Sequence, residues 1–545
     1  MPVVTFDYTD FITLLGHKIS MDELTQKLPM IGADLDKVEK NTISLEFFPN
    51  RPDLTSVEGI ARAARAFFNI KTGLQHYKTT PSDIRTTIDP SVKEVRPFIT
   101  TALIKNVTIT DTLIVSLMDL QEKLHTGLGR NRKKVAIGVH NFAPLTPPFT
   151  YKAVEPDSVS FIPLTKTEPM TLREILRSHE KGIAYAHLVD ELPQYPLLVD
   201  AQNNVLSFPP IINGSLTEVT PTTKELFIDV TGTDQKAVNV ALNIITTALV
   251  DRGGHLFTTT ITDGSTQFHA PDFKPTERTL SVAYVNEMLG TTLNDHDVLV
   301  CLEKMGYQAM VQKKGILTVQ IPAWRSDILH EVDLVEDVMI GYGFDQTKPD
   351  FPKALTYGKE LRKQKLYDTF RNIFIGLGFN EVTTFTISNE HVEFTKMGLK
   401  KSGCVQIENP IGEEYSCLRV SLLPSLLGLL QENKHHPLPQ QIFEVGIIAD
   451  ENGKNHRHLG AVKIDAKASF TMCKAIIETI LRDTNIQASI IETNHPTFVP
   501  GRCAELIKEN ISIGVFGELH PQTITAFTLE HPSIALELNI DKLHP

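Results

Sequence analysis

The sequence has few cysteines and no long hydrophobic run. Its five cysteines among 545 residues form no C-x-x-C pair, so we expect reduced, mostly buried thiols of a cytosolic protein. The apolar segments 238–250 and 422–430 fall short of the roughly 20 residues that a bilayer-spanning helix needs. The first residues, MPVVTFDYTDF, lack the basic stretch and apolar core of a secretion signal. We therefore expect a cytoplasmic protein that does not enter a membrane.

Positive charge and common catalytic motifs are also scarce. Lys and Arg total 53 against 65 Asp and Glu, which gives a net charge of −12 and argues against a general polyanion binder. The sequence contains no phosphate-binding P-loop, H-E-x-x-H zinc helix, G-x-S-x-G elbow or G-x-G-x-x-G dinucleotide turn. A long chain without such motifs is a candidate for a subunit that supports another chain.

What is present indicates a multidomain α+β protein. Apolar residues make up 41% and charged residues 22%, as in ordinary globular proteins, and the length suits three or four domains of roughly 100–200 residues. The spacing of apolar residues predicts helices and strands in alternation. The expected helices are 113–124, 237–250, 298–305, 332–340 and 366–377, and the expected strands include 44–48, 102–109, 135–140, 226–230 and 381–387.

Three local features complete this outline. Residues 76–97 are polar with three prolines, so we expect a linker there, and we expect a third domain boundary at 346–354. Thr55 followed by Glu58 has the spacing of a capping box, which predicts that a helix begins at this point.

A strongly acidic helix is predicted near the middle of the chain. Between Arg325 and Lys348 there are six acidic residues and no Lys or Arg. At about 100° per residue, Asp333, Glu336 and Asp337 fall within one sector of the helix. The residues expected on the opposite, apolar side are Ile328, Val332, Val335, Val338 and Met339.

Asp327 lies just before this helix and joins the acidic group. Like charges one turn apart repel by a few tenths of a kcal/mol per pair, and a hard cation would offset that cost. Ligands that are all oxygen favour Mg²⁺ or Ca²⁺. The alternatives are a solvated acidic face near a helix N-terminus, and a basic surface supplied by another chain.

Two polar segments interrupt the β-rich region. Segment 206–215 places Ser207 and Asn213 among prolines and apolar residues, and segment 226–234 places Asp229 inside an apolar strand. An aspartate there needs hydrogen bonds, and it serves either as a ligand-binding or catalytic carboxylate or as a structural one.

A short basic loop precedes the strand expected at 135–140. It contains Arg130, Arg132, Lys133 and Lys134. Such a charge run can contact phosphate, but a solvated loop is the more common outcome, and we expect that here.

Seven segments, in order along nearly the whole chain, now point to one family. They resemble the β subunit of phenylalanyl-tRNA synthetase in its archaeal and eukaryotic cytosolic form. The segments are FFPNRPDLTSVEGIARA (47–63), FPPIINGS (208–215), FIDVTGTD (227–234), IPAWRSDILHEVDLVEDVMIGYGFD (321–345), NPIGEEYSCLRVSLLPSLL (409–427), IFEVG (442–446) and PGRCAELI with GVFGELHP (500–521).

The resemblance implies a class II aminoacyl-tRNA synthetase. In this family the β subunit joins an α subunit in an (αβ)₂ heterotetramer, and the substrate is tRNA(Phe). The α subunit then carries the aminoacylation site and uses ATP, and Mg²⁺ is shared between the subunits. The family's Mg²⁺ ligands on the β subunit match Asp327, Asp333, Glu336 and Asp337. The implied domains are an N-terminal α+β domain with linker (1–90), a β-rich editing-like domain (91–265), a winged-helix-like module with the acidic helix (266–346) and an inactive class II core built on an antiparallel sheet (350–545).

Two features of the sequence support the loss of activity in that core. Class II cores place an Arg two residues before a strand Glu to hold the ATP α-phosphate. Here Glu444 has Ile442 at that position, which cannot pair with phosphate. The segment 514–518 also lacks the Arg that ends the Gly-rich junction of active cores.

The editing-like domain implies hydrolysis of Tyr-tRNA(Phe), an ester. An apolar site cannot strongly reject an added hydroxyl, so a second site that hydrogen-bonds it can select the wrong product. Ser207, Asn213, Asp229 and Asp234 are the candidates to orient the tyrosine hydroxyl, the amino group or an attacking water. Two alternatives remain: a stand-alone deacylase of mischarged tRNA, and a tRNA-binding scaffold without activity.

Overall fold

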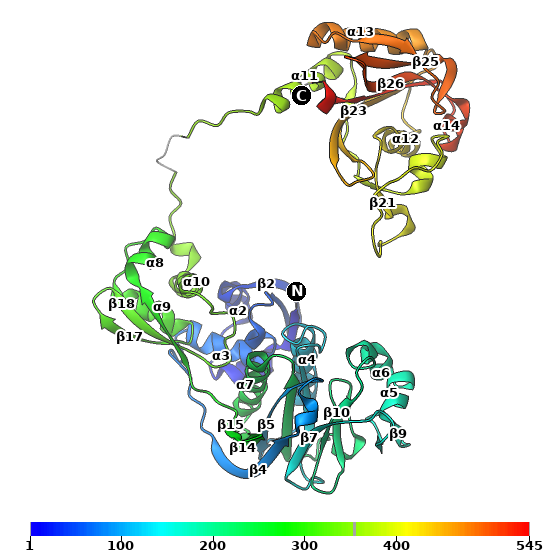
Figure 1. The fold of residues 1–545 in the computed structure, drawn as a ribbon. Coiled ribbons are helices and arrows are strands. Elements are labelled where there is room, and N and C mark those ends of the chain that lie inside the picture. Colours follow the sequence, from blue (N-terminus) through cyan, green and yellow to red (C-terminus); the bar gives the residue numbers. More distant parts are fainter. Residues whose placement is uncertain (1, 352–355, 544–545) are drawn as a thin grey trace. The chain divides into compact units, whose positions relative to one another are not determined.

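The computed structural model describes residues 2–351 and 356–543. It divides into two compact units, Met1–Asp350 and Phe351–Pro545, each of mixed α/β structure (Figure 1). Within the described residues, every helix is too short or too polar to cross a lipid bilayer.

The N-terminal part of the first unit is a three-stranded antiparallel sheet in the order β1-β3-β2, covered by helices. Its elements are β1 (Val3–Asp7), α1 (Tyr8–Leu15), α2 (Met21–Lys27), β2 (Ala33–Glu39), β3 (Thr42–Phe47) and α3 (Val57–Phe67).

The predicted capping box at the start of α3 is wrong by one residue. The cap is Ser56, whose side chain accepts a hydrogen bond from the backbone N–H of Gly59 at 3.2 Å. The hydroxyl of Thr55 instead donates to the carbonyl of Pro52, because a short 3₁₀ turn precedes the helix. Glu58 is buried and receives a hydrogen bond from Arg252.

A ten-stranded sheet forms the body of the first unit. Its strand order is β12-β11-β10-β7-β4-β14-β5-β13-β6, with β15 paired to β14, and α7 and α4 pack on it (Figure 1). Its strands are β4 (Thr80–Ile88), β5 (Phe98–Lys105), β6 (Val135–Asn141), β7 (Phe149–Val154), β10 (Tyr195–Val199), β11 (Val205–Phe208), β12 (Ile212–Asn213), β13 (Glu225–Gly232), β14 (His255–Asp263) and β15 (Thr266–Ala270). The associated elements are α4 (Asp111–Thr126), α5 (Leu172–Ser178), α6 (Glu180–Tyr185), α7 (Gln235–Asp251), β8 (Ser160–Phe161) and β9 (Met170–Thr171).

The prediction of a linker at 76–97 is wrong for residues 80–88, which form strand β4. This strand lies inside the sheet, parallel to both β7 and β14. Ile84, Thr86 and Ile88 alternate as its buried positions, a two-residue period that the polar composition hides. The boundary expected at residue 265 falls in the turn of the β14–β15 hairpin, so β15 stays with the large sheet.

A smaller module follows, with a three-stranded antiparallel sheet in the order β16-β18-β17 and three helices. Its elements are β16 (Thr276–Ser281), α8 (Val282–Leu289), α9 (Asp295–Lys304), β17 (Gln308–Lys313), β18 (Ile316–Ile321) and α10 (Glu331–Tyr342). The helices predicted at 298–305 and 332–340 are confirmed as α9 and α10. The faces of α10 differ from the prediction, because Asp337 is buried whereas Val332 is 40% exposed.

The second unit is built on a seven-stranded sheet in the order β19-β22-β23-β27-β26-β25-β24, antiparallel except where β19 runs parallel to β22. The strands of this sheet are β19 (Asn380–Glu381), β22 (Gln440–Ala449), β23 (Asn455–Ile464), β24 (Ser489–Glu492), β25 (Phe498–Lys508), β26 (Ile511–Leu519) and β27 (Ser533–Asn539). A separate two-stranded sheet pairs β20 (Ile387–Ser388) with β21 (Cys417–Leu418). Its helices are α11 (Arg362–Gly376), α12 (Leu423–Glu432), α13 (Phe470–Thr484) and α14 (Pro521–Ala526).

The two faces of this sheet have separate cores. Phe443 packs on one face with α11 and α13, while its neighbour Ile442 packs on the other with α12, as the alternation of strand side chains requires. The strand predicted at 381–387 is wrong in its middle. Thr384 leaves the strand path there and donates its hydroxyl hydrogen to Glu444 at 2.6 Å.

Candidate active site

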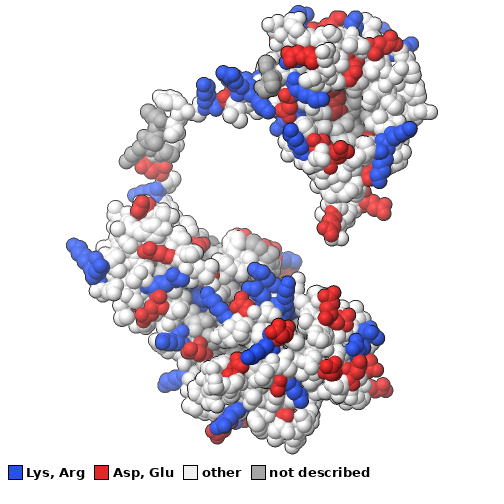
Figure 2. All heavy atoms as spheres, viewed as in Figure 1, with Lys and Arg blue, Asp and Glu red and all other residues white. Residues whose placement is uncertain are grey.

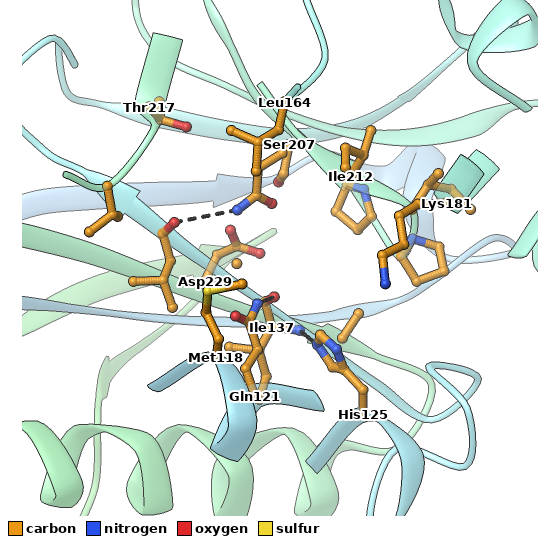
Figure 3. A pocket seen from close by; sticks show the side chains of 18 of the residues that line it. Met118, Gln121, His125, Ile137, Leu164, Lys181, Ser207, Ile212, Thr217 and Asp229 are labelled. Atoms are coloured by element: carbon orange, nitrogen blue, oxygen red, sulfur yellow. Dashed lines mark hydrogen bonds between the residues drawn. The ribbon is translucent and has the colours of Figure 1, made fainter. Parts of the chain in front are cut away.

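A pocket of about 520 Å³ lies beside the large sheet of the first unit. Three of the four predicted editing residues line it: Ser207 from β11, Asn213 from β12 and Asp229 from β13. Figure 3 shows the Asp229 carboxylate in the middle of the pocket, with Ser207 above it and Met118 and Gln121 below. The structure thus brings together residues from segments that the sequence separates.

Asp229 is buried and held from one side. Its Oδ1 atom lies 2.6 Å from Nε2 of His140, and Nδ1 of that imidazole lies 2.8 Å from the hydroxyl of Thr217. All three side chains are buried, and Thr217 lines the pocket with Asp229. The second carboxylate oxygen, Oδ2, has no hydrogen-bond partner among the described residues and is available to a bound molecule.

Gly138 makes room for this pair. It lies opposite Asp229 on the neighbouring strand β6. A Cβ atom at this position would stand 2.3 Å from Oδ1 of Asp229 and 2.6 Å from Nε2 of His140. The contact between His140 and Asp229 therefore depends on the absence of a side chain at Gly138.

Ser207 and Asn213 face each other in the β11–β12 pair. The Oγ atom of Ser207 is buried without a hydrogen-bond partner in the described structure, which is costly unless a ligand or water supplies one. The amide of Asn213 donates to the carbonyl of Val139 at 3.3 Å. Ser207 is thus one of the pocket-lining residues that has a buried polar atom free to bond a ligand.

Arg132 is not part of a solvated loop, and that expectation is wrong for this residue. Its guanidinium is buried and donates to the carbonyls of Pro210 and Ile211 at 3.2 and 3.0 Å. It also stacks on the ring of Tyr185 at 4.3 Å and pairs with Glu122. Arg132 therefore fixes the proline-containing segment that forms one wall of the pocket.

Two titratable groups beside Arg132 are perturbed. The nearby imidazole of His125, whose Nδ1 lies 3.7 Å from the Glu122 carboxylate, together with the charge of Arg132, lowers the pKa of Glu122 to about 2. Burial lowers the pKa of His125, and the Nε2 atom of this residue accepts a hydrogen bond from the backbone of Ile137 at 2.8 Å. His125 is thus a neutral structural group in the pocket wall.

Asp234, the fourth predicted residue, lies outside the pocket wall. It is the N-cap of α7, accepting a hydrogen bond from the backbone N–H of Ala237 at 3.1 Å, and it pairs with Lys134 at 2.9 Å. These bonds lower the pKa of Asp234. Its place in the structure is that of a helix cap.

Sequence reasoning missed His140 and Thr217. His140 ends the apolar strand predicted at 135–140, and a histidine in a buried strand was the available signal. Thr217 had no local signal, because only the return of the chain after β12 brings it to β6.

The acidic residues before and on α10 do have a positive partner. It is Arg325, the residue at which the acidic segment begins, so counting only the charges between Arg325 and Lys348 leaves it out. Arg325 itself is buried and forms ion pairs with Asp327 at 2.6 Å and with Asp337 at 2.7 Å. Tyr307 also donates a hydrogen bond to Asp337. Two of the four predicted Mg²⁺ ligands are therefore held by an arginine.

The other two predicted ligands differ from each other. Asp333 caps the helix, accepting hydrogen bonds from the backbone N–H groups of Leu329 and His330 at 2.7 and 2.6 Å. Burial and the charges of the neighbouring aspartates raise the pKa of Glu336. Among the described residues, no group of three or more His, Cys, Asp or Glu is placed to hold a metal ion. These carboxylates alone do not fit a complete Mg²⁺ site.

The C-terminal unit has an internal ion pair at the expected phosphate-binding position. Ile442 is buried in the core. Glu444 pairs with the buried Arg419 at 2.6 Å, and Arg419 also donates to the carbonyl of Ile447. The charge of Arg419 is thus used within the fold.

Comparisons with known proteins agree across the chain. The family model "tRNA synthetase B5 domain" matches residues 278–344, and "Phenylalanyl tRNA synthetase beta chain CLM domain" matches residues 348–540. Over 541 residues, 99% of this chain and 100% of the relative, the sequence is 42% identical to a phenylalanine–tRNA ligase beta subunit of Methanothrix thermoacetophila. The sequence is also 40% identical over 543 residues to a phenylalanine–tRNA ligase beta subunit of Archaeoglobus fulgidus. That match covers 99% of this chain and 98% of the relative.

A solved structure is similar to the first part of the chain. It is an N-terminal fragment of the phenylalanyl-tRNA synthetase beta subunit from Pyrococcus horikoshii, with 37% sequence identity and a TM-score of 0.61. The match covers 63% of this chain and 99% of the fragment.

Proposed function

Since the chain belongs to the family of phenylalanine–tRNA ligase beta subunits, we propose that its first unit removes tyrosine from mischarged Tyr-tRNA(Phe). The chain is a ligase subunit. In this proposal an α subunit, joined with it as an (αβ)₂ heterotetramer, uses ATP to attach phenylalanine to tRNA(Phe).

One observation carries the editing proposal. Ser207, Asn213 and Asp229, which the sequence predicted, line a single pocket, and one oxygen of the buried Asp229 has no hydrogen-bond partner among the residues that the structure describes. The volume of about 520 Å³ suits an aminoacyl adenosine end with its amino acid inside. Lys181 also lines the pocket and offers positive charge to the tRNA backbone.

The reaction needs one water and one base. Oδ2 of Asp229 accepts a proton from a water molecule as the water oxygen attacks the ester carbonyl. The bond between that carbonyl carbon and the ribose oxygen then breaks. Tyrosine leaves as the free acid, and the terminal ribose recovers its hydroxyl by taking the proton.

His140 positions the base. One orientation of the Thr217 hydroxyl donates to Nδ1 of the neutral imidazole, whose Nε2–H then donates to Asp229. The other orientation donates to the carbonyl of Gly214 at 3.1 Å. Thr217 thus holds the ring of His140 in place behind Asp229.

Ser207 supplies discrimination. Its unpartnered Oγ is the group in the wall that a tyrosine hydroxyl would satisfy, and phenylalanine has nothing to offer it. The test is hydrolysis of Tyr-tRNA(Phe) and Phe-tRNA(Phe) by the assembled complex with Ser207→Ala. Loss of the preference for the tyrosyl ester, with charging of phenylalanine unchanged, supports the proposal. An unaltered preference refutes the role of Ser207.

The partner proposal rests on exposed apolar residues of the second unit. Ile375, Phe385 and Ile411 are 57%, 78% and 102% exposed. A contiguous exposed apolar patch is typical of a surface that another chain covers, and we propose that these three residues contribute to one. Charging of tRNA(Phe) by the chain alone would refute the division of labour, and an active monomeric deacylase would favour the stand-alone alternative.

Basic residues are not gathered into one broad patch on the face seen in Figure 2, where acidic and basic side chains alternate. An exposed cluster does occur at the start of the second unit. It consists of Lys359, Arg362, Lys363 and Lys365. This cluster is a candidate contact for tRNA phosphates in the complex.

The Mg²⁺ proposal needs ligands from the partner. Glu336 has no hydrogen bond or ion pair among the described residues, and burial together with the negative charges of the neighbouring aspartates raises its pKa. A cation shared with the α subunit would offset that charge. Glu336→Gln should then weaken Mg²⁺-dependent assembly, and unchanged assembly with and without a chelator would argue for a solvated face.

A further inference from the structure

A second pocket, of about 590 Å³, lies in the C-terminal unit on the sheet face that α12 covers. Part of its wall is apolar and comes from Phe394, Met397 and Leu423. The polar residues of the wall are Glu393, Ser402, Ser421, His458, His495, Thr497, Glu505, Ser512, Glu537 and Asn539, with Lys400 and Lys542 exposed. The volume is far larger than a bare ion needs and suits a small organic molecule.

Glu393 is the unusual member of this wall. Its side chain is fully buried, and its Oε2 atom accepts a hydrogen bond from the backbone N–H of Val420 at 3.0 Å. Its Oε1 atom is buried and has no hydrogen-bond partner in the described part of the chain. Burial raises the pKa of Glu393 to about 7. A buried acceptor of this kind costs free energy unless a donor arrives.

The neighbouring acid, Glu537, differs from Glu393 because both of its carboxylate oxygens have hydrogen-bond partners. It accepts hydrogen bonds from the backbone of Leu422 at 3.1 Å, from the hydroxyl of Ser421 and from Nδ1 of His458 at 2.7 Å. These bonds lower the pKa of Glu537, so this carboxylate is charged and fully used. The negative charge of Glu537 adds to the attraction of the pocket for a cationic group.

We propose that this pocket binds a small organic molecule whose protonated amino group donates to Oε1 of Glu393 and whose apolar body packs on Phe394, Met397 and Leu423. An ammonium group supplies both the missing donor and the charge that the two carboxylates favour. The carboxylates of Glu393 and Glu537 would repel a purely anionic molecule. This site is independent of the pocket around Asp229.

Two small probes that differ at one group test the proposal. Phenethylamine carries an ammonium group on an aromatic body, and 3-phenylpropionate carries a carboxylate on a similar body. Saturation-transfer NMR on the full chain should show binding of phenethylamine and much weaker binding of 3-phenylpropionate. Asp229→Asn should leave this binding unchanged, which separates it from the first pocket.

Glu393→Gln is the matched variant, since its amide oxygen still accepts from Val420 while its NH₂ group meets the ammonium as a donor. Binding should fall about tenfold. Ser402→Trp fills the pocket from an exposed position and should abolish binding even if the first variant does not fold. Equal binding of both probes, no binding, or binding that survives both variants would overturn the proposal.

Discussion

Nε2 of His140 lies 2.6 Å from Oδ1 of Asp229, and both side chains are buried between neighbouring strands β6 and β13. This contact fixes Oδ1 of the Asp229 carboxylate and leaves Oδ2 free to contact a molecule bound in the pocket. The strands place the two residues, while Gly138 keeps the space between them open. The proposed hydrolysis depends on this arrangement.

Replacing His140 should slow deacylation without abolishing it. In His140→Ala the carboxylate of Asp229 loses its orienting partner, and we expect hydrolysis of Tyr-tRNA(Phe) to fall about 100-fold, near the lower end of general-base effects. Thr217→Ser should retain activity and Thr217→Val should lose part of it, because only the hydroxyl is needed. Rates from purified complexes measure this. If the valine and serine variants behave alike, Thr217 takes no part.

Gly138→Ala should damage the site through a single methyl group. The new Cβ would overlap Asp229 and His140, so we expect a loss of deacylation and about 1–3 kcal/mol of stability. Gly428→Ala in α12 is the control, because no described atom outside the local backbone of this helix lies within 4 Å of its Cβ position and the helix gains about 0.5–1 kcal/mol. Melting temperatures and deacylation rates distinguish the two. Normal activity in Gly138→Ala would contradict the packing argument.

Asp234→Ala should affect stability and leave chemistry intact. Loss of the α7 cap should cost about 1 kcal/mol, while the exposed pair with Lys134 adds little. Denaturant unfolding and the deacylation rate of the same preparation check this. A large loss of deacylation at unchanged stability would return Asp234 to the active site.

Glu393 should make stability depend on pH in a defined direction. Because burial raises its pKa from 4.5 to about 7, the protonated form favours the folded chain. Its contribution is fully present below about pH 4.5 and is lost as pH rises through 7, on the order of 3 kcal/mol. As pH rises from about 4.5 through 7, the melting temperature of Glu393→Gln should therefore fall less than that of the wild type. Parallel pH profiles would show that the buried acid does not titrate there.

Much of the fold could be predicted from periodicity. The long helices α4, α7, α9, α10 and α11 carry strong apolar stripes, and the sequence places all five. Strand β4 was missed because its exposed positions are polar and it begins beside a proline, although Ile84, Thr86 and Ile88 alternate inward. Non-local pairing decides such a strand, and a single sequence does not report it.

The candidate site was predictable only in part, for a similar reason. Ser207, Asn213 and Asp229 stand out as polar residues inside apolar strands. His140 becomes significant only when β6 pairs with β13. Arg325 shows the opposite error, since a charge count along the chain missed the nearest cation in space.

The most direct test of the central claim is single-turnover hydrolysis of Tyr-tRNA(Phe) by the assembled complex carrying Asp229→Asn. Asparagine preserves shape and hydrogen bonding to His140 but cannot accept the proton from water. The account predicts a fall of about 100-fold or more in hydrolysis, with phenylalanine charging unchanged. Hydrolysis at the wild-type rate would contradict it.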